Sequence, residues 1–276
     1  MMIHIVTDSS ADIPEDWLQR YKIHVVPLSV RVNGKEYIEG INITAQQFYQ
    51  EMFAADELPK TSQPTPAQFA EVFQALSGQG IVICLTISSK LSGSFSSANL
   101  GKESSGNEDV LVFDTLSGSL GHGIMVLKAA EMAETGASAD QIMEQLKKMR
   151  ERTKLLILLD TLENIVKGGR LNRVQGSLAK LLNIKVILHN VDGHVEILEK
   201  IRGRNKFLQR AVELVGEYGE DFSQRMIGIT HVNNLADARI LAAEIEAHYH
   251  PQKILISEMG ASTATYAGKD GLIVAL

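Results

Sequence analysis

The chain has 276 residues, of which 45% are apolar and 22% charged, and its formal net charge is −6, so it has the composition of a globular protein and lacks the basic excess of a general nucleic-acid binder. Its single cysteine, Cys84, excludes an internal disulfide and favours a reducing, cytoplasmic location. No stretch approaches the roughly 20 apolar residues that span a bilayer, and the first residues have no secretion-signal pattern, so no permanent membrane anchor is expected.

Short β-type runs alternate with helical patterns through most of the chain, which predicts an α/β fold with helices flanking its sheets. In the first half we predict strands at Ile3–Thr7, His24–Val32, Ile81–Ile87 and Val110–Asp114. Helices are predicted to begin near Thr44, Pro66, Ser92, Gly121 and Ser138. Thr44 is followed three residues later by Gln47, which is the capping-box pattern of a helix start.

The second half continues the same alternation. Strands are predicted at Leu155–Leu159, Ile184–Asn190, Val195–Ile201, Met226–His231, Lys253–Glu258 and Leu272–Leu276. Helices are predicted at Leu162–Lys167, Val174–Leu182, Lys206–Tyr218 and Leu235–Tyr249. Asp192-Gly193, between two of the strands, is a strong hairpin signal. We place a domain boundary near Arg152, which gives an N-terminal α/β domain of residues 1–152 and a C-terminal α/β domain of residues 153–276.

Two polar loops are candidates for binding a ligand. The first runs from Thr61 to Pro66, with the sequence TSQPTP, and leads into a predicted helix. The second runs from Ser88 to Ser94, with the sequence SSKLSGS, and follows an apolar strand. Ligands of open α/β sheets bind where strands end and helices begin, and the free backbone N–H groups at a helix start favour an anion. Gly93 has no side chain, so a ligand could come close to the backbone there. Together with the hydroxyl groups, these features could hold a carboxylate without an arginine. Helix capping is the alternative for both loops.

Other polar groups favour structural roles. Asp8 and Asp114 follow strands and are expected to accept hydrogen bonds from the backbone of neighbouring loops. Lys167-Gly168-Gly169-Arg170 follows a predicted helix, so it is interpreted as a helix stop in preference to a phosphate loop. The histidines and the cysteine have no metal-ligand spacing, and no metal is expected. Five basic residues lie close together in the sequence, and they are Lys200, Arg202, Arg204, Lys206 and Arg210. The default interpretation of this basic group is a solvated face, and the alternative is a patch that binds an acidic partner or a phosphate.

Together these segments resemble the DegV family, which includes the fatty-acid-binding subunits of bacterial fatty acid kinase. The motifs that carry the resemblance are IVTDSSADIP at 5–14, KTSQPTP at 60–66, TISSKLSGSFSSA at 86–98, VFDT at 112–115, VKGGRLNRVQG at 166–176 and IKVILHNVDG at 184–193. The resemblance implies two α/β domains with parallel or mixed sheets and a buried lipid tunnel. It also implies a protein of phospholipid metabolism that does no chemistry alone, needs no cofactor and presents a long-chain fatty acid such as palmitate to a separate ATP-dependent fatty acid kinase.

The resemblance assigns residues as well. It implies that Thr61 and Ser92 bind the fatty-acid carboxylate, with Ser62 and Tyr266 as additional candidates at the same end. Members of the family commonly end with an H-x-G-P-G motif, whereas this chain has Tyr266-Ala267-Gly268-Lys269-Asp270. A tyrosine in place of the histidine can donate a hydrogen bond but is a poor proton shuttle at neutral pH. This change is therefore expected to affect lipid binding less than it affects presentation of the fatty acid to a kinase.

Two further expectations concern partners and chemistry. If a kinase docks on the basic group, Arg202 and Arg204 are expected to be exposed, to lie on the side of Thr61 and Ser92, and to contact it. The rival to a carrier is an acyl hydrolase or transferase that uses Ser92 or Ser94 as its nucleophile. Such an enzyme needs a base within hydrogen-bond reach, and Lys90 is the nearest candidate.

Overall fold

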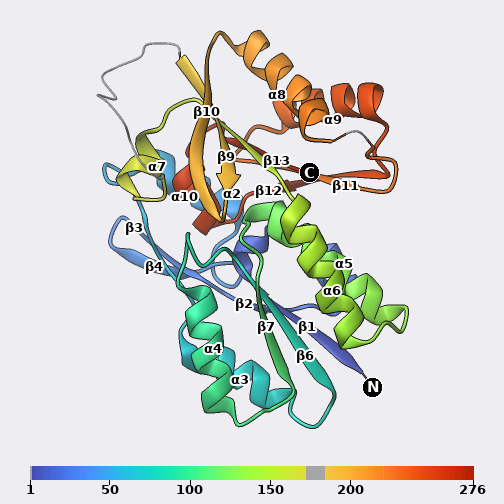
Figure 1. The fold of residues 1–276 in the computed structure, drawn as a ribbon. Coiled ribbons are helices and arrows are strands. Elements are labelled where there is room, and N and C mark those ends of the chain that lie inside the picture. The colour runs from blue at the N-terminus through green and yellow to red at the C-terminus, as the bar shows by residue number, and fades with distance from the viewer. Residues whose placement is uncertain (1, 172–183, 220) are drawn as a thin grey trace.

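The structure is a computed structural model that describes residues 2–171, 184–219 and 221–276. Its first sheet is fully parallel and has the strand order β2 (His24–Val26), β1 (Ile3–Asp8), β6 (Ile81–Thr86) and β7 (Val110–Asp114). One face is covered by α3 (Pro66–Ala75) and α4 (Ser94–Ser105), and the other by α5 (Ser119–Glu134) and α6 (Ala139–Arg152) (Figure 1). The predicted α/β fold with flanking helices is confirmed in this half.

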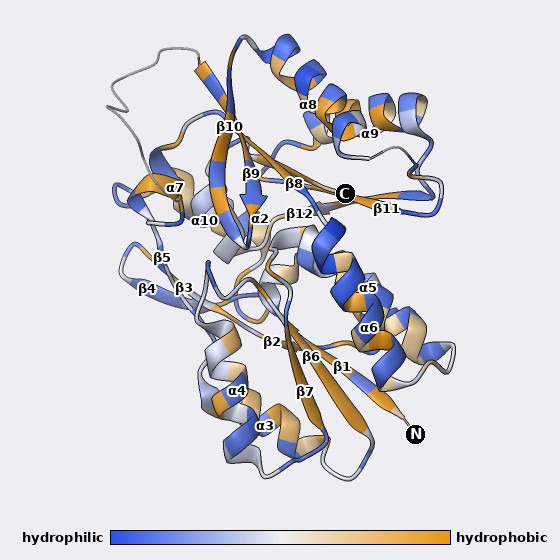
Figure 2. Cartoon of the chain, in the orientation of Figure 1, coloured by the Kyte–Doolittle hydropathy of each residue, from blue (hydrophilic) through white to orange (hydrophobic). Residues whose placement is uncertain are grey.

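The second sheet is mixed. Its order is β10 (His194–Arg202), β9 (Ile184–Val191), β8 (Leu155–Leu159), β13 (Leu272–Ala275), β11 (Met226–His231) and β12 (Lys253–Glu258). Only the β11–β12 pair is parallel among these strands. The outer face packs against α8 (Arg204–Tyr218) and α9 (Leu235–Tyr249), whereas the inner face meets α5. In Figure 2 the strands are mostly orange and the exposed sides of the helices mostly blue, as expected for sheets buried between helices.

The remaining elements are short. A three-stranded antiparallel sheet has the order β4 (Lys35–Ile38), β3 (Ser29–Val32) and β5 (Lys60–Ser62). The short helices are η1 (Ser9–Ala11), α1 (Glu15–Arg20), α2 (Ala45–Ala54), α7 (Glu163–Lys167) and α10 (Ala261–Ala267). The predicted helix Val174–Leu182 lies outside the described residues.

Local signals in the sequence were good guides to helix starts and to the hairpin. Thr44, Thr65 and Ser138 each cap a helix with a complete capping box, which confirms the starts predicted there. Asp192 and Gly193 both have positive φ, 48° and 82°, which is the conformation of a tight type I′ hairpin between β9 and β10. The single strand predicted for His24–Val32 is wrong, because the chain leaves the first sheet after Val26 and enters the three-stranded sheet at Ser29. Proline at position 27 lacks the N–H that an unbroken central strand would use.

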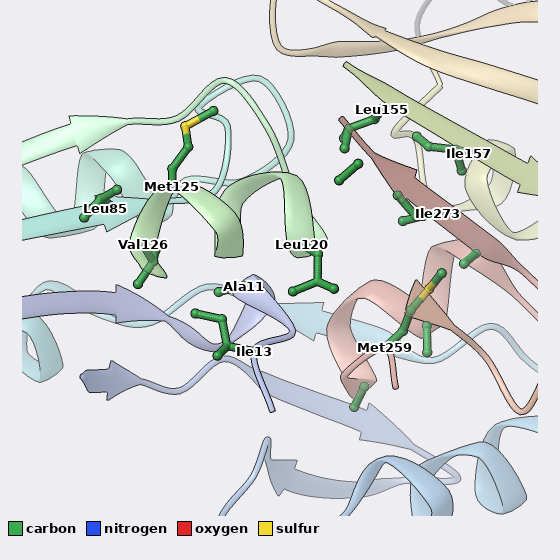
Figure 3. Packing of buried hydrophobic residues seen from close by; sticks show 14 of the residues in the cluster. Ala11, Ile13, Leu85, Leu120, Met125, Val126, Leu155, Ile157, Met259 and Ile273 are labelled. Atoms are coloured by element: carbon green, nitrogen blue, oxygen red, sulfur yellow. The ribbon is translucent and has the colours of Figure 1, made fainter. Parts of the chain in front are cut away.

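The largest hydrophobic core runs through both halves. Buried side chains of α5, β8 and β13 pack together, and Figure 3 shows Leu120 between Ala11 and Ile13 on one side and Leu155, Ile157 and Ile273 on the other. The change of sheet falls between Arg152 and Leu155, close to the predicted boundary. The division into two domains stays a prediction, because the two halves share this core.

Candidate functional site

A cavity of about 390 Å³ lies between the two halves, and both contribute to its wall. This is within the range of about 300–1,000 Å³ that is usual for sites of small organic ligands. Aliphatic side chains form about half of the lining, and they are Leu28, Ile87, Leu91, Leu155, Ile157, Leu159, Ile165, Val195, Ala267 and Ile273. The polar part of the lining comprises Ser10, Thr61, Ser62, Gln63, Ser92, Ser119, Arg170, Ser262, Thr263 and Tyr266. A cavity that combines aliphatic side chains with grouped hydroxyls suits an amphiphile.

One polar group is built around Thr61 and Tyr266. Thr61 lies in β5, where it pairs with Val30, and Tyr266 lies near the end of α10. Their hydroxyl oxygens are 2.6 Å apart, although the residues are separated by 205 positions in the sequence. One hydroxyl must donate to the other, so one hydrogen of the pair remains for a ligand. Ser62 and Gln63, next in the chain, are exposed and also line the cavity, so this group marks its mouth.

The loop after β6 brings Ser92 to the same mouth. Ser92 Oγ lies 2.9 Å from Ser94 Oγ and accepts the backbone N–H of Ser94 at 3.2 Å. Ser92 therefore assists the first turn of α4 and also faces the cavity, so the capping and binding interpretations are compatible. The helix begins at Ser94, two residues later than predicted.

Gly93 has a different role from the one expected. Its expected role was to let a ligand approach the backbone, but the side-chain amide of Gln63 occupies that space, and any Cβ at position 93 would collide with it. Gln63 in turn donates to Ser97 Oγ at 2.9 Å. The glycine thus allows the two predicted loops to pack against each other.

Arg170 brings a positive charge to the mouth. Its guanidinium lies 4.9 Å from the centre of the Tyr266 ring and donates to the carbonyl oxygens of Leu91, at 3.2 Å, and Gly168, at 2.6 Å. Gly168 ends α7, as the helix-stop interpretation predicted, and its lack of a side chain lets the Tyr266 ring pack against it. The guanidinium has further N–H groups that these bonds do not use, so it can also compensate the negative charge of a bound anion.

Two buried carboxyl groups lie beside Ser119 and Ser262, which line the cavity. Asp12 accepts hydrogen bonds from Gly260 N–H at 2.8 Å and Ser119 Oγ at 2.6 Å, and Glu39 accepts from Ser262 N–H at 2.9 Å. Burial, with the charge of Glu39 beside it, raises the pKa of Asp12 from 3.8 to about 8. Burial also raises the pKa of Glu39. These groups hold the start of α10 against the first half of the chain.

Asp8 and Asp114 have the structural roles that the sequence favoured. Asp8 accepts from the backbone N–H groups of Ser10 and Ile87, and Asp114 from those of Ser89 and Leu116. They fix the turns that lead from η1 and β6 toward the cavity.

The structure gathers one group of predicted site residues and separates the other. Thr61, Ser62, Ser92 and Tyr266 all line the cavity. Arg202 and Arg204 are both exposed. Arg202 is the last residue of β10 and Arg204 the first of α8, so both lie at the end of the strand opposite Val195, the residue of β10 that reaches the cavity. At about 3.3 Å per residue, Arg202 lies about 20 Å beyond Val195. Arg204 also forms an ion pair with the buried Asp237 of α9. Figure 2 shows this end of β10 beside the start of α8, away from α10 and β5.

The geometry gives little support to a serine nucleophile. In the described part of the chain, the side-chain partner of Ser92 is Ser94, and Lys90 is exposed without a bond from its amine to either hydroxyl. Within residues 2–171, 184–219 and 221–276, no group of three or more His, Cys, Asp and Glu side chains is placed to hold a metal ion. No helix among these residues is long and apolar enough to cross a membrane.

Sequence reasoning missed several lining residues. Gln63 was within a motif already noted, and Arg170 within another, so both had a local signal. Ser10 lay within the noted motif IVTDSSADIP but was given no role at the site. Ser119, Ser262 and Thr263 had no local signal, because they come from α5 and α10 and meet the rest of the lining only through tertiary packing.

Comparison with known proteins relates this geometry to a family. A family model described as "uncharacterised protein, DegV family" matches residues 2–276. A DegV domain-containing protein of Caldanaerobacter subterraneus is 34% identical over 97% of this chain and 96% of its own length. A solved structure described as fatty acid binding of a DegV family protein, from Thermus thermophilus, is 33% identical with a TM-score of 0.93, over 100% of this chain and 99% of that one. The Fatty Acid Kinase B3 protein of Streptococcus pneumoniae, solved loaded with linoleic acid, is 26% identical with a TM-score of 0.87, over 100% of this chain and 99% of that one.

Proposed function

The chain belongs to the DegV family, and from this premise we propose that it is a carrier that binds one long-chain fatty acid in its cavity and does not transform it. The acyl chain occupies the aliphatic chamber, and the carboxylate is bound at the mouth by Thr61 and Ser92, with Ser62 and Tyr266 beside them. The observation that carries this proposal is an apolar cavity whose mouth joins two hydroxyl pairs and one arginine.

The donors at the mouth match a carboxylate in number. Each of the pairs Thr61–Tyr266 and Ser92–Ser94 uses one hydroxyl hydrogen internally and leaves one free. Two free O–H donors suit the two oxygens of one carboxylate, and Arg170 supplies the compensating charge without needing direct contact.

The chamber is expected to set affinity and the mouth to set orientation. A chain such as palmitate offers about 15 methylenes, each worth about 0.8 kcal/mol on leaving water, or a gross gain of about 12 kcal/mol. A hydrogen bond between neutral groups adds only about 0.5–1.5 kcal/mol net, and one to a charged group about 1.5–3 kcal/mol. The named ligands of the relatives are compatible with such a division, since fatty acid binding is reported for the Thermus thermophilus protein and linoleic acid for the Streptococcus pneumoniae protein.

The proposal extends to a partner, a place and a domain division. A separate ATP-dependent kinase phosphorylates the carboxylate, and the exposure of Ser62 and Gln63 supports access to the mouth from outside. The buried free thiol of Cys84 and the use of ATP by the partner favour the cytoplasm. Residues 1–152 supply the loops at Thr61 and Ser92, and residues 153–276 complete the chamber from β8, β13 and α10.

Mass spectrometry of the protein purified without detergent tests the carrier. We expect one free fatty acid per chain, and Ser92→Ala is expected to weaken capture of an added fatty acid about 10-fold while lipid remains detectable, because one bond to a charged group is lost. Ser89→Ala removes an exposed hydroxyl of the same loop and is the matched control. Absence of lipid together with failure to bind added fatty acid would overturn the proposal. An esterase activity that Ser92→Ala abolishes would replace the carrier with the enzyme.

A further inference from the structure

The cavity has a second polar surface, which the carboxylate does not need. Ser10, Ser119, Ser262 and Thr263 line the same chamber from η1, α5 and the start of α10. Ser10, Ser119 and Ser262 are buried, whereas Ser62 is exposed and Tyr266 half-buried, so this surface lies deeper than the hydroxyls at the mouth. We refer to these four residues as the inner hydroxyl wall.

Three hydroxyls of the inner hydroxyl wall already donate their hydrogens to buried carboxyl groups. Ser10 Oγ donates to Asp8, Ser119 Oγ to Asp12 at 2.6 Å and Ser262 Oγ to Glu39 at 2.9 Å. A hydroxyl has one hydrogen and two lone pairs. Ser119 Oγ also lies 2.8 Å from Thr230 Oγ1, which uses one of its lone pairs, so each of the three oxygens keeps at least one lone pair to accept with. Turning one of these hydrogens toward the cavity would remove one hydrogen bond from a buried carboxyl group, which is costly. These serines therefore offer acceptors to whatever lies in the chamber.

Thr263 is the adjustable member of the inner hydroxyl wall. Its hydroxyl is 3.5 Å from Asp12 Oδ1, at the outer limit of a hydrogen bond, and the residue is only partly buried. The weak bond can be exchanged at small cost, so Thr263 can donate into the cavity. The wall as a whole combines fixed acceptors with one available donor.

An unsubstituted acyl chain matches this surface poorly. A methylene placed against the wall removes water from the serine lone pairs and returns no hydrogen bond. A hydroxyl group on the acyl chain can donate to a serine oxygen and accept from the Thr263 hydroxyl, so it pairs with both the acceptors and the donor of the wall. Rigid polar groups that a ligand leaves unpaired are a strong source of discrimination between ligands that differ by one hydroxyl.

We propose that the inner hydroxyl wall recognises a hydroxyl group borne along the acyl chain, so that the ligand class includes long-chain hydroxy fatty acids. This inference rests on the proposed fatty-acid binding and specifies the substrate class of the same cavity. Ordered water against the wall, under an unsubstituted chain, is the competing arrangement, and binding measurements distinguish the two.

The test compares octadecanoic acid with a series of its monohydroxy isomers in competition against a fluorescent fatty acid. Burying a hydroxyl without a partner costs about 1–3 kcal/mol, so a mismatched isomer should bind about 5- to 150-fold more weakly than octadecanoic acid. We expect one narrow range of hydroxyl positions to escape this penalty and to bind at least as tightly as octadecanoic acid. A uniform penalty at every position, with octadecanoic acid bound, would overturn this inference and leave the carrier intact. Failure of octadecanoic acid and all isomers to bind would overturn both.

Thr263→Val supplies the matched variant because valine has nearly the same shape and no hydroxyl. We expect the affinity for the preferred isomer to fall about 10-fold and the affinity for octadecanoic acid to rise, so the two effects have opposite signs. Thr135→Val, at the exposed end of α5, should leave the ratio unchanged. Ser119→Ala gives a second, independent variant should Thr263→Val fail to fold. An unchanged ratio in the folded variant would overturn the inference.

Discussion

The buried pair Asp12 and Glu39 is the least expected feature at the scale of single residues. Their exposed fractions are 6% and 7%, and both serve the start of α10 through backbone N–H groups. Because burial raises the pKa of Asp12 from 3.8 to about 8, the folded protein keeps a proton there that the unfolded chain has lost. The folded state thus binds more protons between about pH 4 and pH 8, and its stability must fall as pH rises through that window. Glu39, whose pKa is also raised, acts in the same direction.

Asp12→Asn is expected to make the free energy of unfolding less dependent on pH. The amide has the shape of the carboxyl group, its oxygen can accept from Gly260 N–H, and it does not titrate. Its NH2 group faces Ser119 Oγ, whose hydrogen must then turn from position 12 toward Thr230 Oγ1. Urea unfolding at several values between about pH 5 and pH 8 should show a clearly shallower decline than in the parent chain, with a residual slope from Glu39. Asp16→Asn, at an exposed position of α1, is the control. An undiminished slope in Asp12→Asn would contradict the assignment.

Single residues could be predicted from the sequence where a local motif surrounds them. Thr61, Ser92, Asp8 and Asp114 each stand in a short polar segment at the end of a strand or the start of a helix. The contact of Thr61 with Tyr266 spans 205 positions, and that of Glu39 with Ser262 spans 223, so neither has a local signature. The motifs identified the mouth of the cavity, whereas its inner wall required the fold.

At the scale of elements, the apolar strands were predicted far better than the polar ones. Leu155–Leu159, Met226–His231 and Lys253–Glu258 match residue for residue, because each is a compact β-type run at the centre or edge of a sheet. The strands β4 and β5 were missed. Their residues are largely polar and partly exposed, and they form strands only because β3 lies between them. The resulting sheet is what places Thr61 opposite α10.

The packing of α7 against α10 is expected to control the position of Tyr266. Gly168→Ala introduces a Cβ that collides with the Tyr266 ring, so the ring must move away from Thr61. We expect a several-fold loss of fatty-acid affinity with a smaller loss of thermal stability, since the ring lies at the partly exposed mouth. Binding of a fluorescent fatty acid and a melting curve measure the two effects.

Gly169→Ala separates this contact from backbone strain. Gly169 has a φ of 69° and open space around its Cα, so alanine there costs about 1 kcal/mol of strain without touching Tyr266. It should lower stability and leave affinity near the parent value. Equal affinity in the two variants would show that α7 does not position the tyrosine.

The whole molecule places its cavity where the two halves meet. The hairpin of β9 and β10 crosses this junction, and Ser88 of the first half donates to the carbonyl of Gly193 at its tip at 2.8 Å. The other end of the hairpin carries Arg202, about 20 Å from the cavity at the spacing of a strand. An ordinary interface of about 800 Å² per partner is nearly 30 Å across, so one docked protein can cover both Arg202 and the mouth.

Arg202→Glu tests whether a kinase uses this surface. The two arginines are not equivalent, because Arg204 is paired with the buried Asp237 and its loss should lower stability, whereas Arg202 is exposed and takes part in no ion pair among the described residues. Reversing the charge at Arg202 should leave the bound lipid and the melting temperature unchanged. It should slow acyl phosphate formation by the cognate kinase about 10-fold at low salt and less at high salt, because a charge at the rim of an interface acts mainly on the association rate. Lys147→Glu makes the same charge change at an exposed position of α6, in the half of the chain that does not carry the hairpin, and should have no effect. Equal turnover in Arg202→Glu and Lys147→Glu would remove the basic end of β10 from the docking surface and would leave the exposed loop at Ser62 and Gln63 as the place where the kinase meets the carboxylate.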